Sequence, residues 1–207
     1  HKKGLKKARI GVLSDAFGSD NNNKSAPVNS VVEDSLSRMA EAGSEIITDI
    51  SIPNLEYYLR EASLYEYQSK NDINSFLQSL NDPPVDSIDE IFEKGVFPNK
   101  MGDLDWLRNG SSEPTKHIKY WQSVETQNEF QREIQSVFAK HDLDAIAFPD
   151  VQIIPRLISD LPQIEDEESY LINTLIGSFS SCPAISMPGG FTDDRLPVGI
   201  ELLGVPY

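Results

Sequence analysis

The closing segment of the chain, CPAISMPGGFTDDRLPVGIELLGVPY at residues 182–207, predicts a β-hairpin. Residues 184–191 and 196–204 are rich in the apolar and β-branched side chains that favour strands. Only residues 192–195 connect them, and a connection this short places two strands side by side and antiparallel. The sheet of this protein is therefore expected to contain an antiparallel pair at the end of the chain.

The beginning of the chain predicts a parallel pair of strands. Residues 8–13, ARIGVL, and residues 45–52, EIITDISI, have strand composition. Between them, apolar residues recur at helical spacing, and the members of this stripe are Val32, Leu36, Met39 and Ala40. Ser30 and Glu33 have the spacing of a capping box, so we expect the helix to open at Ser30 and to stop at Gly43. A strand, a helix and a strand in succession form a βαβ unit with parallel strands.

The middle of the chain reads as mostly helical. A helical stretch is expected over residues 53–80 with an interruption near 71–72, followed by a short helix over 87–97 and a long helix over 115–140. Residues 98–115, which contain Gly and Pro, form an irregular connection. Irregular connections of this length are often functional or mobile, and we expect mobility here.

A third strand and a further helix complete the pattern. Residues 144–149, DAIAFP, are apolar at their centre and are expected to be buried in the middle of the sheet. A helix is expected over residues 169–178, preceded by four acids at 165–168, which a helix N-terminus favours without any metal. The chain is thus predicted to be an α/β protein with a mixed β-sheet flanked by helices. No clean boundary divides it, so residues 1–207 are expected to form one domain.

Composition excludes several classes of function. The net charge of −15 would repel a phosphate backbone, so no nucleic-acid partner is expected. A single cysteine allows neither an internal disulfide nor a Cys-rich zinc site, and it fits a reducing cytoplasm. The histidines, at positions 1, 117 and 141, lack metal-ligand spacing, so no metal site is expected. No stretch is apolar enough to span a membrane. No Gly-rich phosphate loop is present either, and no cofactor is expected.

A nucleophile is hard to find among the residues themselves. Ser178, Ser180, Ser181 and Cys182 cluster before the hairpin, but no GxSxG elbow surrounds them. A serine nucleophile needs a base within hydrogen-bond reach, and neither histidine beyond the N-terminus has a sequence context that suggests this role. Small polar residues that end a helix before a strand are the structural alternative, and we prefer it.

The same closing segment, extended to residues 180–207, resembles the C-terminal signature of the amidase signature family of serine hydrolases. In that family a helix ends in a small-residue turn, enters a Pro-Ala-x-Ser-x-Pro strand and returns through a Leu-Pro-x-Gly arm. The matching residues here are Pro183, Ala184, Ser186, Pro188, Gly190, Leu196, Pro197 and Gly199. Residues 4–13 and 141–150 also resemble family strands, although Asp150 stands where the family usually has Thr.

The resemblance implies amide hydrolysis by a Ser–cis-Ser–Lys triad carried by the other half of the fold. This sequence contains no Gly-Gly-Ser-Ser-Gly loop and no lysine in the corresponding context, so no catalytic residue is assigned to it. It then looks like the C-terminal portion of an amidase: a fragment, a cleavage product or one piece of a split enzyme. In that role it would be inactive alone and would take the N-terminal half and a small amide substrate as partners. Phe148, Asp150 and Asn173 are the residues expected to line the acyl or leaving-group pocket.

Two other interpretations stay open at this point. The chain could be a self-sufficient ligand-binding or protein-binding α/β domain that uses its tyrosines and its long loop. It could also be an independent hydrolase that uses Ser181 or Ser186, although no base is visible. Half of a larger sheet would expose an apolar strand edge, through which copies of the chain could also pair into a homo-oligomer.

Overall fold

The computed structural model describes residues 4–95, 105–155, 157–159 and 173–206. It divides into two compact units, one made of residues 1–59 and 127–207 and the other of residues 60–126. The sequence-based expectation of one domain over residues 1–207 stays a prediction.

A five-stranded mixed sheet forms the centre of the first unit. Its strand order is β2-β1-β3-β5-β4, and the strands are β1 (Arg9–Leu13), β2 (Glu45–Ile50), β3 (Ala145–Pro149), β4 (Ala184–Phe191) and β5 (Pro197–Leu203). Strand β1 pairs with β2 and β3 in parallel, whereas β5 pairs with β3 and β4 antiparallel. The expected βαβ unit, the central third strand and the closing hairpin are all confirmed, and with them the α/β class.

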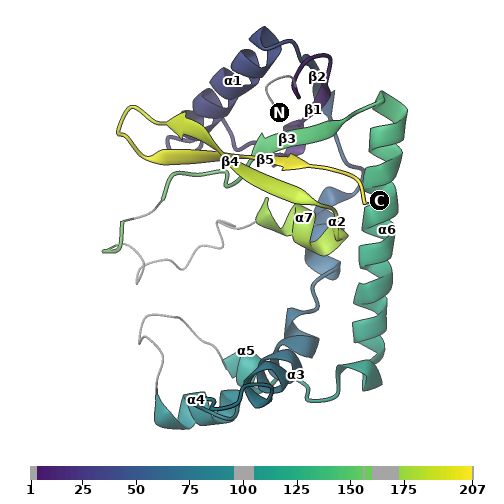
Figure 1. Cartoon of the computed structure of the whole chain (residues 1–207), viewed down its shortest axis with the longest axis vertical. Helices are drawn as coiled ribbons and strands as arrows, with labels where there is room; N and C mark the ends of the chain where they lie inside the picture. The colour runs from purple at the N-terminus through teal and green to yellow at the C-terminus, as the bar shows by residue number, and fades with distance from the viewer. Residues whose placement is uncertain (1–3, 96–104, 156, 160–172, 207) are drawn as a thin grey trace. The chain divides into compact units, whose positions relative to one another are not determined.

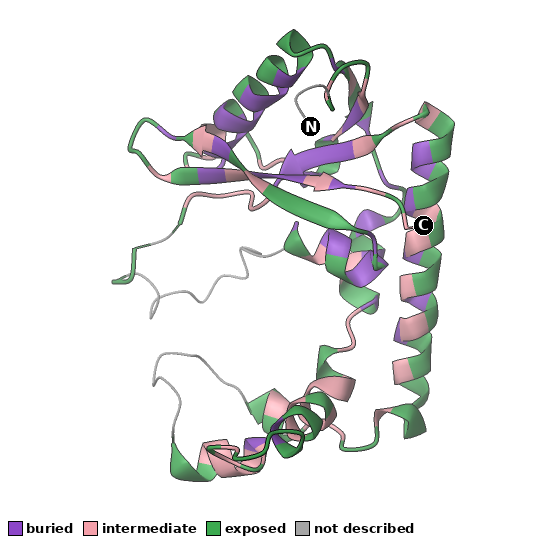
Figure 2. Ribbon diagram, viewed as in Figure 1, coloured by how far each residue is buried: buried purple, intermediate pink, exposed green. Residues whose placement is uncertain are grey.

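Helix α1 (Ala26–Glu41) covers one face of this sheet (Figure 1). It begins one turn before Ser30, so the expected capping box is wrong and Ser30 lies inside the helix. Pro27 occupies the first turn, where a missing N–H costs nothing and the fixed φ favours helix. The side of α1 that faces the sheet is buried and the opposite side is exposed (Figure 2).

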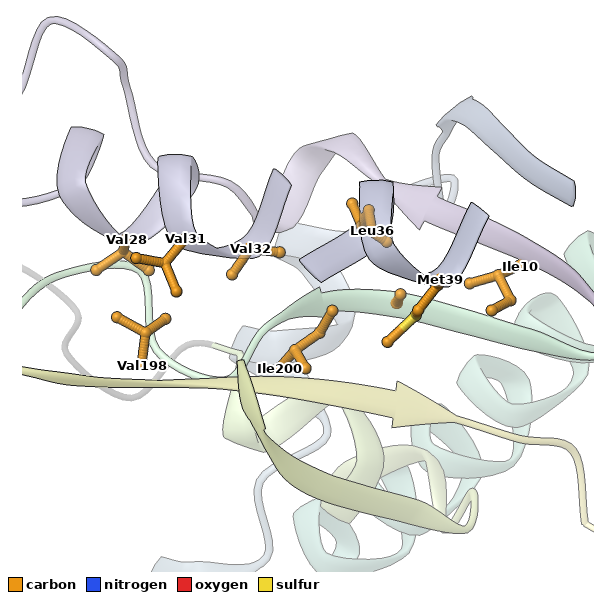
Figure 3. Packing of buried hydrophobic residues seen from close by; sticks show 9 residues of the cluster. Ile10, Val28, Val31, Val32, Leu36, Met39, Val198 and Ile200 are labelled. Atoms are coloured by element: carbon orange, nitrogen blue, oxygen red, sulfur yellow. The ribbon is translucent and has the colours of Figure 1, made fainter. Parts of the chain in front are cut away.

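A layer of branched side chains joins α1 to the sheet. In Figure 3 the apolar stripe of α1 points towards residues of β1 and β5, and the labelled members are Val28, Val31, Val32, Leu36, Met39, Ile10, Val198 and Ile200. Because side chains alternate along a strand, Val198 and Ile200 face α1 while Glu201 faces α7 on the other side of the sheet. Ser35 of α1 also donates a hydrogen bond to the Gly189 carbonyl in the hairpin, at 2.8 Å.

Helix α7 (Thr174–Ser180) lies on the opposite face of the sheet (Figure 1). Gly177 allows this close packing, because a Cβ there would lie 3.0 Å from the Ala184 Cβ and 3.2 Å from Glu201 Oε1. The helix was expected at residues 169–178; residues 160–172, including the acids 165–168, lie outside the described residues.

Two further helices contribute to the first unit through part of their length. They are α2 (Leu55–Glu61) and α6 (Ile118–His141), of which residues 55–59 and 127–141 belong here. The Tyr58 ring stacks on Phe130 at a centroid separation of 4.8 Å, and both side chains are buried. Burial and the nearby carboxylates of Glu133 and Glu129 raise the pKa of Tyr58.

The second unit is built mainly of short helices. They are α3 (Tyr65–Gln78), α4 (Ile88–Lys94), α5 (Asp105–Arg108) and the 3₁₀ turn η2 (Pro114–Lys116); another 3₁₀ turn, η1 (Ser14–Ala16), belongs to the first unit. The helical break falls at residues 62–64 and not at 71–72, where Asn71 and Asp72 hydrogen-bond to each other and leave the helix intact. The predicted short helix is confirmed as α4, whose Ser87 side chain accepts from the Glu90 N–H. Residues 98–104 of the expected mobile region lie outside the described residues.

No described helix is long and apolar enough to cross a membrane.

Candidate functional site

A mostly apolar cavity of about 590 Å³ opens beside the point where the chain leaves β3. We call it the Asp150 cleft. Its polar side chains are Asp150 and Ser186, and its apolar lining includes Val28, Ile153, Ile154, Pro155, Met187, Phe191 and Val198. An apolar cavity of this size with a few convergent polar groups has the general form of a small-molecule site.

Asp150 is held in place by both strands of the hairpin. Its backbone N–H donates to the Gly199 carbonyl at 3.1 Å, and its side-chain Oδ2 accepts from the Ser186 hydroxyl at 2.6 Å. Position 199 must be small, because a Cβ there would lie 2.8 Å from Asp150 Oδ2 and 3.0 Å from the Asp150 Cβ. The carboxylate is therefore fixed against β5 while one side of it faces the cleft.

Glu201 lies next to Asp150 and is buried, with 6% of its surface exposed. It is the cross-strand partner of Ser186 in β4 and of Phe148 in β3, so these three side chains share one face of the sheet. Burial raises the pKa of Glu201 to about 7, and the hydrogen bond and the negative charge of Asp150 act in the same direction. Sequence reasoning missed this residue. The signal that could have found it is a single acid inside an otherwise apolar strand.

Asn173 ties together the loops that follow β1 and β3. Its side-chain amide donates to the Ala16 carbonyl at 2.8 Å and to the Pro149 carbonyl at 2.7 Å, and its Oδ1 accepts from Gln152 at 3.3 Å. Asn173 is 2% exposed, and its side chain makes no capping bond to α7, which begins next to it. It also lines a second cavity of about 610 Å³, together with residues that follow β1 and β2.

Replacing Asn173 by Ala is expected to lower the free energy of unfolding by about 1–3 kcal/mol, since two buried carbonyls would lose their donor. Urea denaturation followed by circular dichroism measures this change. Asn128→Ala, on an exposed position of α6, is the matched control and should change stability by less than about 0.5 kcal/mol. Equal effects of the two substitutions would show that Asn173 does not hold the loops.

Phe148 is fully buried on the central strand. The three candidate pocket residues are thus placed differently: Asp150 lines the cleft that bears its name, Asn173 lines the second cavity, and Phe148 packs inside the sheet layer. The three residues are nevertheless close along the backbone. Pro149 lies between Phe148 and Asp150 in the sequence, and the Asn173 side chain donates a hydrogen bond to the Pro149 carbonyl. Contact of any of the three with a substrate stays a prediction.

The serines before the hairpin serve the backbone. Ser180 is fully buried and donates to the Ile176 carbonyl at 2.6 Å, while Ser178 donates to the carbonyl of Thr174 at 3.3 Å. Ser181 adopts a left-handed conformation, φ 53°, that ends α7. These bonds agree with the interpretation of the serines as a helix terminus.

The chemistry that this arrangement offers is acceptance of hydrogen bonds. The Asp150 carboxylate has more acceptor positions than its bond to Ser186 occupies, so it can receive an N–H or O–H from a molecule in the cleft. Within the part of the chain that the structure describes, no group of three or more His, Cys, Asp or Glu is arranged to hold a metal ion.

Comparison with known sequences matches the whole chain to one protein family. The family model described as Amidase matches residues 1–207. A glutamyl-tRNA(Gln) amidotransferase subunit from Saccharolobus solfataricus is 26% identical over 215 residues, which cover 97% of this chain and 42% of that protein. The corresponding protein from Desulfotalea psychrophila is 27% identical over 226 residues, with the same two coverages. The chain therefore spans about 42% of the length of these curated relatives.

Solved structures share the fold at lower identity. The peptide amidase from Stenotrophomonas maltophilia superposes with a TM-score of 0.68 at 18% identity, covering 100% of this chain and 41% of that one. An amidase family protein from Bacillus anthracis str. Ames gives a TM-score of 0.66 at 19% identity, covering 99% of this chain and 36% of that one. The mixed sheet with its flanking helices is thus an arrangement that known amidases contain.

Proposed function

Since the chain belongs to the amidase family, we propose that it forms the scaffold and part of the substrate pocket of an enzyme that hydrolyses carbon–nitrogen amide bonds. The observation that carries this proposal is the match of the family model to all 207 residues, combined with coverage of about 42% of the relatives' length. The chain has no Gly-Gly-Ser-Ser-Gly loop, so the Ser–cis-Ser–Lys triad implied by the resemblance would come from a separate portion of the amidase. On this account the chain is inactive alone.

The proposed contribution of this chain is a wall opposite the nucleophile. Amide hydrolysis passes through a tetrahedral intermediate, which needs a substrate held in one orientation and shielded from water. The Asp150 cleft supports such a role, because it combines apolar walls with one fixed carboxylate. Phe148, Asp150 and Asn173 are assigned to the acyl or leaving-group pocket, with Asp150 at the cleft wall and Phe148 and Asn173 behind it.

The proposed partner is the triad-bearing N-terminal half of the same amidase. Strand β4 is the last strand of the described sheet and pairs with β5 on one side only. It exposes Ile185 by 58% and Phe191 by 70%, and an exposed apolar edge strand is a natural place for another segment to pair. Pairing with a second copy of the chain through the same edge is the alternative occupant. A cytoplasmic location stays a prediction.

The proposed substrate is a small-molecule amide. Two relatives are named as subunits of a glutamyl-tRNA(Gln) amidotransferase, and a structural neighbour is named as a peptide amidase. The names of these similar proteins therefore point to substrates of different sizes. The net charge of −15 opposes approach of a tRNA backbone, which favours the small amide.

The test is complementation. Mixing or fusing the chain with the triad-bearing half of the amidase is expected to produce amidase activity on small aliphatic and aromatic primary amides that neither part shows alone. In the active assembly, Asp150→Ala is expected to lower kcat/KM about 10- to 100-fold, because a fixed hydrogen-bond acceptor is lost from the pocket wall. Unchanged kinetics would show that Asp150 does not take part in the pocket. Amidase activity of the chain alone would contradict the proposal that the catalytic triad lies in the other half.

A further inference from the structure

We propose that Glu201 is a positioning residue, which holds the Asp150 carboxylate at the wall of the Asp150 cleft through a proton that the two carboxyl groups share. The inference rests on the proposed function, in which this cleft receives part of the amide substrate. The carboxyl pair itself does not depend on any substrate.

The strand register brings the two carboxyl groups together. Phe148 of β3 lies opposite Glu201 of β5, so Asp150, two residues further along and on the same face, converges on Glu201 where the chain turns away from the sheet. The Asp150 N–H bonds to the carbonyl of Gly199, two residues before Glu201 on β5, and the hydroxyl of Ser186, the cross-strand partner of Glu201, donates to the Asp150 carboxylate. Hydrogen bonding to Asp150 is accordingly one of the causes of the raised pKa of Glu201. Two carboxyl groups can hydrogen-bond to each other only if one of them carries a proton, so the proposed pair is held together by one proton.

The proton belongs to Glu201 for a physical reason. Glu201 is 6% exposed, whereas Asp150 lies at the cleft wall and accepts the Ser186 hydroxyl. Burial disfavours the charged form of a carboxyl group, so the buried Glu201 keeps the proton. Burial, the hydrogen bond and the charge of Asp150 together raise the pKa of Glu201 to about 7. The protonated Glu201 therefore donates to the Asp150 carboxylate below this pH.

Among the described residues that shift the pKa of Glu201, none is a cation that would stabilise its negative charge. Strand β4 presents Ser186, β3 presents Phe148, and α7 presents the backbone of Gly177, none of which ionises in this range. Asp150 is the charged group that bears on Glu201. When Glu201 loses its proton, the bond is lost and two negative charges face each other at close range, so Asp150 is pushed from its position.

Displacement of Asp150 would change the wall of the Asp150 cleft. Asp150 is the first residue of the segment 150–155, which supplies several of the lining residues. Backbone bonds hold this segment at each end, from the Asp150 N–H to the Gly199 carbonyl and from the Ile154 N–H to the Lys24 carbonyl. The amide protons of Asp150 and Ile154 therefore report how firmly the wall is held.

The first measurement is a ¹³C NMR titration of the Glu201 side-chain carboxyl in the full 207-residue chain. Its midpoint is expected near neutral pH, and in an Asp150→Asn variant it should move towards the ordinary range for Glu, because the neighbouring negative charge is gone. A midpoint near 4.5 in the unaltered chain would overturn the proposal. This result needs no substrate, so it is distinguishable from a failure of the complementation test.

The second measurement separates positioning from general stability. Glu201→Gln supplies a permanent N–H donor to Asp150 and is expected to keep the Asp150 and Ile154 amides protected at every pH, while Glu201→Ala loses that protection throughout. The unaltered chain should lose protection about tenfold, beyond the intrinsic pH effect, between about pH 6 and pH 8. Identical exchange profiles in the unaltered chain and Glu201→Gln would contradict the proposal.

Discussion

Glu201→Gln is expected to raise the free energy of unfolding at about pH 8 by about 3 kcal/mol and to leave it nearly unchanged at about pH 4. Glu201 has a folded-state pKa of about 7, above its ordinary value of 4.5, so between these values the folded chain binds more protons than the unfolded chain. The stability contributed by protonated Glu201 is fully present below the unfolded pKa and is lost as the pH rises through the folded pKa. Gln, which never ionises, removes this loss.

Chemical denaturation of both proteins across this pH range measures the effect. Glu41→Gln, on the exposed end of α1, is the matched control and should follow the unaltered chain within about 0.5 kcal/mol. Parallel stability curves for the unaltered chain and Glu201→Gln from about pH 4 to about pH 8 would contradict a buried protonated carboxyl.

Phe148→Ala is expected to lower the free energy of unfolding by about 3–5 kcal/mol, because it removes a fully buried aromatic ring from the central strand and leaves a cavity. Its ring shares a sheet face with Glu201, so the loss should also reach the carboxyl pair. Urea titration gives the change in stability, and the ¹³C midpoint of Glu201 gives the local response.

Phe191→Ala is the matched control for Phe148→Ala. Phe191 is 70% exposed at the end of β4, and its removal should change the stability of the isolated chain by less than about 0.5 kcal/mol. If Phe191 lies in the interface with the triad-bearing half, the same substitution should weaken complementation. A Phe148→Ala chain as stable as Phe191→Ala would show that β3 is not the centre of the packed sheet.

The elements with local patterns were predictable from the sequence. The hairpin follows from two strand-forming runs and a four-residue connection, and the buried strand β3 follows from the uninterrupted apolar run AIAF. The start of α1 was misplaced because the Ser30–Glu33 pair matches a capping box, whereas Pro27 and the residues before it already favour the first turn. Boundary signals compete within a few residues, and the sequence does not show which one prevails.

The site was predictable only in part, because its decisive contacts are not local. Asp150 was singled out at a loop that follows a strand, but its bond to Ser186 and its contact with Glu201 depend on the register of β3, β5 and β4. The role of Asn173 likewise depends on loops that follow β1 and β3, which meet only in the folded sheet. Periodicity identifies which face of a strand is buried, but not which two polar residues meet there.

The most direct test of the central claim is the intact mass of the chain after exposure to a fluorophosphonate, which acylates activated serines. No adduct is expected on the chain alone, and a serine in the triad-bearing half is expected to be labelled once the two parts are combined. A stoichiometric adduct on Ser180, Ser181 or Ser186 in the isolated chain would mean that the closing segment is itself catalytic, and would contradict the scaffold role proposed for this part of the amidase.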